Sequence, residues 1–455
     1  MEWQCRQAGH MPKFAILSVG TRPTAAGQKQ TRRSRQGKKA SVVANGCHLF
    51  PEILKSREFS AVYFACRSGE GSGSFRDTLE AKRNIQLDGW RAFGVAGVMW
   101  HHWAPREWRG PFPFEIGLFF FLTLTGFLIT RILLREKDAG ERLGKPWRIR
   151  AYRTFQKRRL GRILAPCYAA MLFAMVVGAS DIRDYPLAYF GHFSNFHMAW
   201  MDGWPSGTAH YWTLALQIQF YLFWPLLVFF VPRRALGWVF AACALLAPLS
   251  RLLIEREFPA IQHGGVITTA AFDYFGAGAL LALAFDRGIQ AENRKIALAG
   301  WLAFAGYLTL YVLNEAGRSA GGCGYFQQTL LAVAFAGLIS ATLGGLGGVA
   351  GRLLEHPAVQ HVGRLSYGLY LFHTPVPLFL GCVLPLLWWP VFDGPLLAMR
   401  LAAFALTSWG IAWLCWRWLE GPDRIDFLQL GRGSRLARWL RRSGDKAFRQ
   451  KGRHE

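Results

Sequence analysis

The sequence predicts an all-α polytopic membrane protein with about ten transmembrane helices and both termini in the cytoplasm. Two observations carry this prediction. Of the 455 residues, 52% are hydrophobic, and they gather into blocks of roughly 20 residues, the length that crosses the hydrocarbon core of a bilayer. The basic residues collect between these blocks and at the two ends of the chain, as expected for cytoplasmic loops.

Ten apolar blocks follow one another from residue 88 onward, and each is predicted to be one helix. The fifth block is short and is also consistent with a re-entrant segment. The predicted spans are 89–106, 114–134, 163–180, 211–231, 235–250, 266–285, 296–313, 327–348, 365–387 and 396–418.

The loops alternate in charge, and this alternation sets the predicted orientation. The segment 131–162 holds twelve Lys or Arg residues, and every even-numbered block is followed by basic residues. The loop 181–209 holds only Arg183, and 388–395 holds none. Since cytoplasmic loops are enriched in Lys and Arg, the even-numbered exits are predicted to face the cytoplasm. Arg251 and Arg256, after the fifth block, fit this pattern less well.

Three regions are predicted on composition. Residues 1–85 are basic and poor in apolar periodicity, which indicates either a disordered cytoplasmic tail or an over-extended gene start. Residues 86–420 form the membrane domain, and 421–455 a basic cytoplasmic tail. The net charge of +25 is explained by the positive loops, so we expect no nucleic-acid partner. The eight cysteines are scattered, and we expect no metal site.

Arg91 and His102 are the first candidates for chemistry. They are eleven residues apart, so on one helix they share a face within about 20° and differ by about 16 Å in depth. A snorkelling Arg and an interfacial His are the simpler explanation for each alone. Ionisable groups at membrane depth nevertheless indicate a functional site. His101 points about 80° away and is the weaker candidate.

Three further polar patterns interrupt or flank the apolar blocks. Arg159 and Arg162 are neighbours on a helix and suit phosphate oxygens, although a positive-inside charge run explains most of the basic residues around them. His210 and Gln217 are seven residues apart at a helix entry. His373 precedes Pro375, where the helix is predicted to kink, and a core His bonded to a freed carbonyl is the alternative.

These stretches together resemble the membrane-bound acyltransferase-3 family, whose members O-acylate polysaccharides and related acceptors. Leu87-Asp88-Gly89-Trp90-Arg91 with His102 is similar to the family's motif of Arg, ten residues, His, and Arg159 with Arg162 to its Arg-x-x-Arg motif. Thr125 stands at the Ser position of a Phe-Phe-x-x-Ser-Gly-Phe-Leu-Ile stretch. Gln217 departs from the Glu of many members, and a Gln cannot act as a base.

The resemblance implies an O-acyltransferase in the cell's inner or plasma membrane, in contact with membrane lipid. It implies no permanently bound cofactor, a cytoplasmic acyl-CoA donor (acetyl-CoA above all) and a hydroxyl of a surface or exported glycan as acceptor. His102 is then general base or transient acyl carrier, with Arg91 orienting the site. Arg159 and Arg162 bind the donor phosphates, and His210, Gln217 and His373 are candidates for acceptor binding. The alternative is a transporter or flippase that uses the same Arg and His for substrate or protons.

Overall fold

The computed structural model describes residues 84–144, 146–317, 321–384 and 395–420, and within these residues every regular element is helical. The predicted tails 1–85 and 421–455 lie almost entirely outside the described residues, so the orientation of the termini stays a prediction. The predicted membrane domain begins close to the first described helix, which Asn84 caps by accepting a hydrogen bond from the backbone N–H of Leu87 at 3.2 Å.

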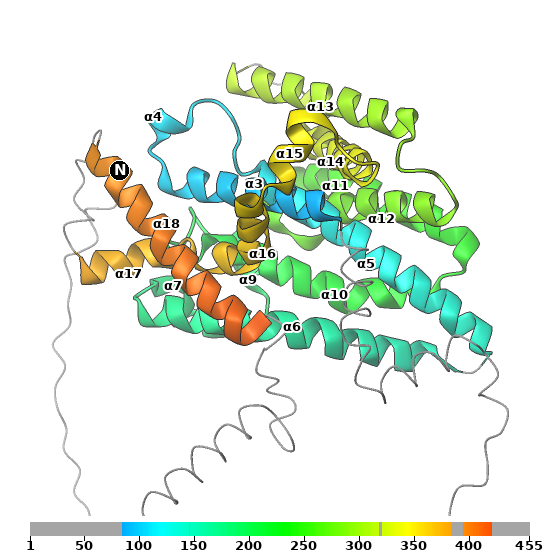
Figure 1. Cartoon of the computed structure of the whole chain (residues 1–455), viewed down its shortest axis with the longest axis horizontal. Helices are drawn as coiled ribbons and strands as arrows, with labels where there is room; N and C mark the ends of the chain where they lie inside the picture. The colour runs from blue at the N-terminus through cyan, green and yellow to red at the C-terminus, as the bar shows by residue number, and fades with distance from the viewer. Residues whose placement is uncertain (1–83, 145, 318–320, 385–394, 421–455) are drawn as a thin grey trace, which may run out of the picture. The chain divides into compact units, whose positions relative to one another are not determined.

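Ten long helices account for the ten predicted blocks (Figure 1). They are α3 (Ile85–Trp103), α5 (Ile116–Leu143), α6 (Arg148–Val176), α10 (Trp212–Phe230), α11 (Leu236–Glu257), α12 (Phe272–Asp286), α13 (Arg294–Glu315), α14 (Gln327–Leu343), α16 (Pro357–Phe372) and α18 (Pro395–Cys415). Short helices join them: α4 (Arg106–Arg109), α7 (Ser180–Asp184), α8 (Pro186–Phe190), α9 (Ser194–Ala199), α15 (Gly348–Glu355) and α17 (Pro375–Val383). Single turns include η1 (Ala209–Tyr211), η2 (Arg233–Ala235), η3 (Gly264–Val266), η4 (Thr268–Ala271), η5 (Gly321–Phe326) and the π-helical η7 (Trp416–Glu420).

Among the described residues, eight helices are long and apolar enough to cross a membrane, and α3 and α16 fall outside that set. The multi-pass prediction is therefore supported, whereas the count of ten spans is not settled. Outward apolar side chains fit a lipid environment. On α13, for example, Trp301 is 71% exposed and Leu302 is 64% exposed.

The expectation of a short fifth block was wrong, because α11 continues to Glu257 and is 22 residues long. The apolar run ends in the sequence at Arg251. In the structure this guanidinium is nearly buried and lies 2.6 Å from the carboxylate of Asp273 on α12. A paired charge is much less costly at membrane depth than an isolated one, so the helix continues through it.

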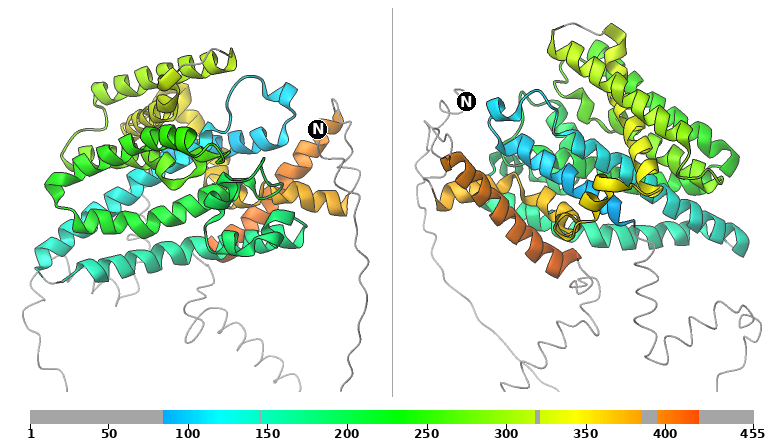
Figure 2. Two further views of the ribbon diagram at one scale, coloured as in Figure 1. Left: turned by 180° about the vertical axis from the view of Figure 1, so that it is seen from behind. Right: turned by 45° about the horizontal axis from the view of Figure 1, so that its top comes forward.

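Helix α3 packs against α5, α14, α15 and α16, and the views in Figure 1 and Figure 2 show it among them. Glycines permit two of these contacts. A Cβ on Gly117 of α5 would lie 2.3 Å from the carbonyl oxygen of Gly94, and one on Gly363 of α16 would lie 2.1 Å from that of Asp88. Any larger residue would push the helices apart. This close packing sets α16 directly beside the helix that carries Arg91 and His102.

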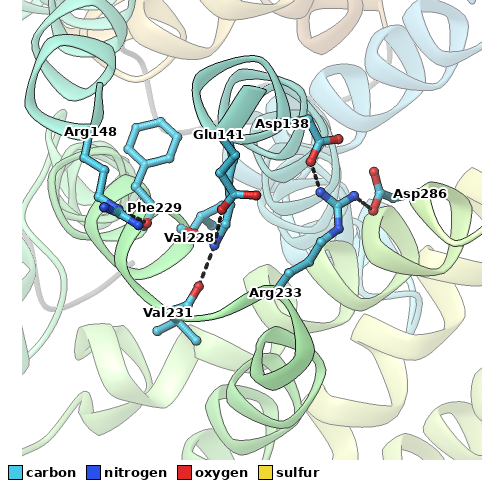
Figure 3. Close-up of polar contacts among 9 residues, drawn as sticks. Asp138, Glu141, Arg148, Val228, Phe229, Val231, Arg233 and Asp286 are labelled. Carbon is cyan, nitrogen blue, oxygen red and sulfur yellow. Dashed lines mark hydrogen bonds and ion pairs between the residues drawn. The ribbon is translucent and has the colours of Figure 1, made fainter. Parts of the chain in front are cut away.

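One end of the bundle is fastened by cations from the predicted cytoplasmic loops (Figure 3). The buried Lys137 ammonium of α5 donates to the carbonyl oxygens of Val228 and Val231, at 3.0 and 2.5 Å. Arg233 of η2 pairs with Asp138 on α5 and Asp286 on α12. Lys137 therefore satisfies carbonyls at the end of α10 that have no intrahelical partner, and Arg233 links α5 to α12 through their carboxylates.

The ninth block is interrupted where the sequence predicted a kink. Helix α16 ends at Phe372, and α17 begins at Pro375. Proline has no N–H to donate, so the backbone hydrogen bond that would continue α16 is lost at Pro375. The break leaves His373 and Thr374 between two helices, where both side chains point to other elements.

Candidate active site

Three histidines from separate parts of the chain lie together. His102 is in the last turn of α3, His210 is in η1, and His373 follows α16. Nε2 of His373 lies 3.3 Å from Nδ1 of His102, and the His210 and His373 rings are 4.7 Å apart between centroids. His210 and His373 are buried, whereas His102 is exposed. The structure thus brings the predicted base, His102, together with His210 and His373, two residues predicted to bind the acceptor.

The hydrogen-bond partners of His102 and His373 indicate which nitrogen of each ring carries the proton. Nδ1 of His373 lies 2.7 Å from the carbonyl oxygen of Tyr370, so it donates there, and its Nε2 is an acceptor when the ring is neutral. Nδ1 of His102 lies 2.9 Å from the carbonyl oxygen of Val98, which makes this nitrogen the donor to both Val98 and His373. The lone pair of His102 is then on Nε2, the nitrogen that a base needs.

Residues around the cluster hold its geometry. The indole N–H of Trp103 donates to the carbonyl oxygen of His373 at 2.8 Å. The Thr374 hydroxyl oxygen lies 2.7 Å from Nδ1 of His210 and 2.9 Å from the carbonyl oxygen of Gly207. Neither Trp103 nor Thr374 was identified from the sequence, because their roles depend on contacts with distant elements.

A cavity of about 240 Å³ opens beside His102. His210 and His373 do not line this cavity. They can therefore affect an acceptor bound there only through His102. The cavity walls come from the end of α3, the loop before η1, the α16–α17 break and α18, and are formed by His102, Trp103, Pro205, Ser206, Gly207, Ala209, Thr374, Pro377, Leu378, Arg400 and Phe404.

Arg91 lies among charged groups that are separate from the histidine cluster around His102. Its Nη1 atom is 3.1 Å from a carboxylate oxygen of Asp88. It also interacts electrostatically with Tyr221 on α10 and with Glu420 in η7. Arg162 interacts with the same two groups, and Arg159 with Tyr221. We call Arg91, Arg159, Arg162, Tyr221 and Glu420 the arginine cluster.

The arginine cluster joins three of the predicted residues and adds two that were not predicted as site residues. Tyr221 ends the polar pattern that begins at His210, and Glu420 opens the Glu-Gly-Pro sequence after the last block. Sequence reasoning did not single out either residue, because a single carboxylate or phenol in an apolar run gives no indication of which cation it meets. Arg158, by contrast, is 73% exposed and lies 3.8 Å from Glu136.

Packed polar side chains lie between the two clusters. Gln217 donates to Thr125 at 3.3 Å, and Thr125 also bonds the Tyr221 hydroxyl. Nearer the histidines, the Thr213 and Tyr370 hydroxyls are 2.6 Å apart. Thr213, Gln217 and Tyr221 are spaced by four residues, so they follow one face of α10. Gln217 therefore lies between Thr213 and Tyr221 on this face of α10, outside the cavity wall.

Within the part of the chain that the structure describes, no three His, Cys, Asp or Glu side chains are arranged to hold a metal ion. Instead, His102 and His373 are hydrogen-bonded to each other, and each of the three histidines is hydrogen-bonded to a backbone carbonyl oxygen. The arrangement can accept a proton at His102 and bind an anion at the arginine cluster.

Comparison with known proteins identifies relatives of the whole membrane domain. The acyltransferase-3 family model, described as an acyltransferase domain, matches residues 84–417. The peptidoglycan O-acetyltransferase OatA of Listeria monocytogenes is 28% identical over 383 residues, which cover 77% of this chain and 57% of that protein. The "Putative peptidoglycan O-acetyltransferase YrhL" of Bacillus subtilis is 28% identical over 322 residues, 64% of this chain and 48% of that protein. The chain thus spans about half the length of these relatives, and no solved structure matches it.

Proposed function

Because the chain belongs to the acyltransferase-3 family, we propose that it is an integral-membrane O-acetyltransferase of the plasma membrane. In this proposal it moves an acetyl group from cytoplasmic acetyl-CoA to a hydroxyl of a surface or exported glycan. The names of the relatives support acetyl as the group transferred and peptidoglycan as one acceptor class. The observation that carries the proposal is the hydrogen bond that leaves Nε2 of His102 unprotonated beside a cavity.

In the proposed reaction His102 acts as general base. Its Nε2 takes the proton from the acceptor hydroxyl while that oxygen attacks the thioester carbonyl carbon. The new C–O bond forms, the C–S bond breaks, and the departing thiolate of CoA takes the proton from Nε2. His373 accepts the hydrogen bond of Nδ1 throughout, which fixes the tautomer of His102 and stabilises the imidazolium that forms transiently.

The arginine cluster is proposed to bind the phosphates of the donor. Guanidinium groups pair with phosphate oxygens through two parallel hydrogen bonds, and CoA carries its phosphates at the opposite end of the pantetheine arm from the thioester. Two separated clusters therefore suit one extended donor. Since packed side chains now fill the space between them, the proposal requires Gln217, Thr125 and their neighbours to separate when the donor binds.

The test uses the purified full chain in proteoliposomes with acetyl-CoA labelled in the acetyl group. Transfer of label to an added glycan, or acceptor-dependent release of CoA thiol, supports the acetyltransferase. Movement of an intact substrate across the bilayer without thioester cleavage would instead identify the transporter alternative. Reconstituted protein that is folded but neither cleaves the thioester nor transfers the label contradicts the proposal.

A further inference from the structure

We propose that the cavity beside His102 is the acceptor site and that Arg400 selects acceptors with an anionic group close to the hydroxyl that is acetylated. This inference rests on the proposed function and adds a substrate class to it. The shared chemistry is an oxyanion, either a carboxylate or a phosphate. Arg400 stands on α18, on the same cavity as the proposed base.

Among the residues that line the cavity, Arg400 is the one whose side chain is charged at every physiological pH. The rest of the wall is His102 together with aromatic, aliphatic, proline and small residues and two hydroxyls. A guanidinium facing a small cavity with mostly apolar walls attracts an anion more strongly than it would in open water. Its planar fork also matches two oxygens of a carboxylate or phosphate.

A chain of contacts fixes Arg400 relative to the histidine cluster. Trp103, next to His102 in the sequence, bonds the carbonyl oxygen of His373, and its ring lies edge to face against Phe404 at 5.8 Å. The guanidinium carbon of Arg400 lies 5.4 Å from the centre of the Phe404 ring. The Phe404 side chain is buried. A cation held on such a ring loses less freedom when it binds a ligand.

The size of the cavity limits what enters. Sites for drug-sized ligands occupy roughly 300–1,000 Å³, so a cavity of about 240 Å³ fits a single sugar ring or a comparable group. Trp103, Phe404 and the two prolines offer apolar walls to the C–H faces of such a ring. His102 and Arg400 then contact two different substituents of the same sugar, one a hydroxyl and the other an anion.

The experiment compares matched acceptors that differ in charge, using the full-length protein in nanodiscs with acetyl-CoA. One pair is N-acetylmuramic acid and its methyl ester, which tests a carboxylate. The other is N-acetylglucosamine 1-phosphate and N-acetylglucosamine, which tests a phosphate. For the wild type we expect kcat/KM for the charged member of one pair to exceed that of the neutral member about tenfold, the effect of a hydrogen bond to a charged group. The acceptor pair in which the charged member is preferred identifies the anion, carboxylate or phosphate, that Arg400 binds.

The variants separate recognition from structural support. In Arg400→Gln the ratio between charged and neutral acceptor should fall to near one, and Arg400→Lys should keep part of it because the charge remains. Arg256→Gln, which removes an exposed cation at the end of α11, should keep the wild-type ratio. Size-exclusion profiles confirm that each variant is folded. The ratio of kcat/KM between charged and neutral acceptors is also measured on the wild type, and that measurement does not depend on any variant.

Two outcomes would overturn the inference. One is a wild-type ratio near one in both pairs. The other is an Arg400→Gln variant that loses rate equally on charged and neutral acceptors, which would indicate a structural, snorkelling arginine. Either result leaves the proposed function intact, because acetyl-CoA is still consumed. Absence of thioester cleavage with every acceptor would refute the proposed function itself.

Discussion

Nε2 of His373 lies within 3.3 Å of Nδ1 of His102, although 271 positions separate the two residues in the chain. His373 reaches this place because α16 ends three residues before Pro375 and because Gly363 lets α16 pack closely on α3. A proline and a glycine thereby help to place the ring that decides which nitrogen of His102 carries the lone pair. The predictions for activity begin from this relationship.

Replacing His102 by Ala should lower acetyl transfer by about 10²–10⁴-fold, the usual contribution of a general base. His101→Ala is the matched control, since that ring lies 2.9 Å from Glu115 and does not line the cavity. Transfer is measured as acetylated glycan at equal protein level. Retained transfer in His102→Ala removes this residue from the mechanism, and loss in His101→Ala alone moves the role by one residue.

His373 is proposed as a positioning residue, so its variants should separate kcat from KM. His373→Leu removes the acceptor for the Nδ1 proton of His102, and kcat should fall about tenfold or more, the value of a hydrogen bond to a charged partner. His373→Gln can still accept that proton and should retain more activity than the Leu variant. KM for acetyl-CoA should stay the same in both. Equal loss in the two variants, with KM also raised, would indicate a purely structural role.

Arg159→Gln and Arg162→Gln should raise KM for acetyl-CoA about tenfold each, because each removes a charged partner of the donor phosphates. Arg158→Gln is the control, since the neighbouring side chain is largely exposed. The decisive comparison uses S-acetyl-pantetheine, a donor that lacks the nucleotide phosphates. With that donor the two variants should match the wild type, and a persistent defect would mean that the arginines act on something other than phosphate.

The sequence predicted the helices well because hydropathy is a local property. Among the described residues, each of the ten apolar blocks contains a long helix or part of one, and Pro375 marked the break in the ninth. The sequence could not predict which polar residues meet. Arg91 and His102 do share α3, but beyond its ion pair with Asp88 on that helix, Arg91 interacts electrostatically with Tyr221 and Glu420. Those partners come from helices more than a hundred residues away, and no spacing within one helix contains that information.

Lys137→Met should destabilise the protein by about 1–3 kcal/mol, the cost of leaving buried polar groups without partners. The substitution removes the ammonium that bonds the carbonyl oxygens of Val228 and Val231 at the end of α10. Lys157→Met is the comparison, because that side chain is exposed on the next helix. Thermal unfolding in detergent measures the difference. Equal melting temperatures for the two variants would mean that the end of α10 does not depend on this contact.

His192 predicts a dependence of stability on pH. It lies in the loop between α8 and α9, where burial lowers the pKa of its imidazole to about 4. Its ring nitrogens have no hydrogen-bond partner among the described residues, and its ring stacks on Tyr168. The folded state therefore favours the neutral ring. Its contribution is fully present above the unfolded pKa of about 6.5 and is lost as the pH falls from there toward 4.

The matched variant is His192→Asn, since Asn tolerates the positive φ of 58° at this position but does not titrate. Both proteins are melted at about pH 7.5 and pH 5, on either side of the unfolded pKa. Between these two pH values, the melting temperature of the wild type should fall by more than that of the variant. Burial opposes the charging of His192 in the native state alone, so removing the imidazole removes that part of the pH dependence. If both proteins lose the same amount, the acid sensitivity comes from other groups and His192 is not buried in solution as it is here.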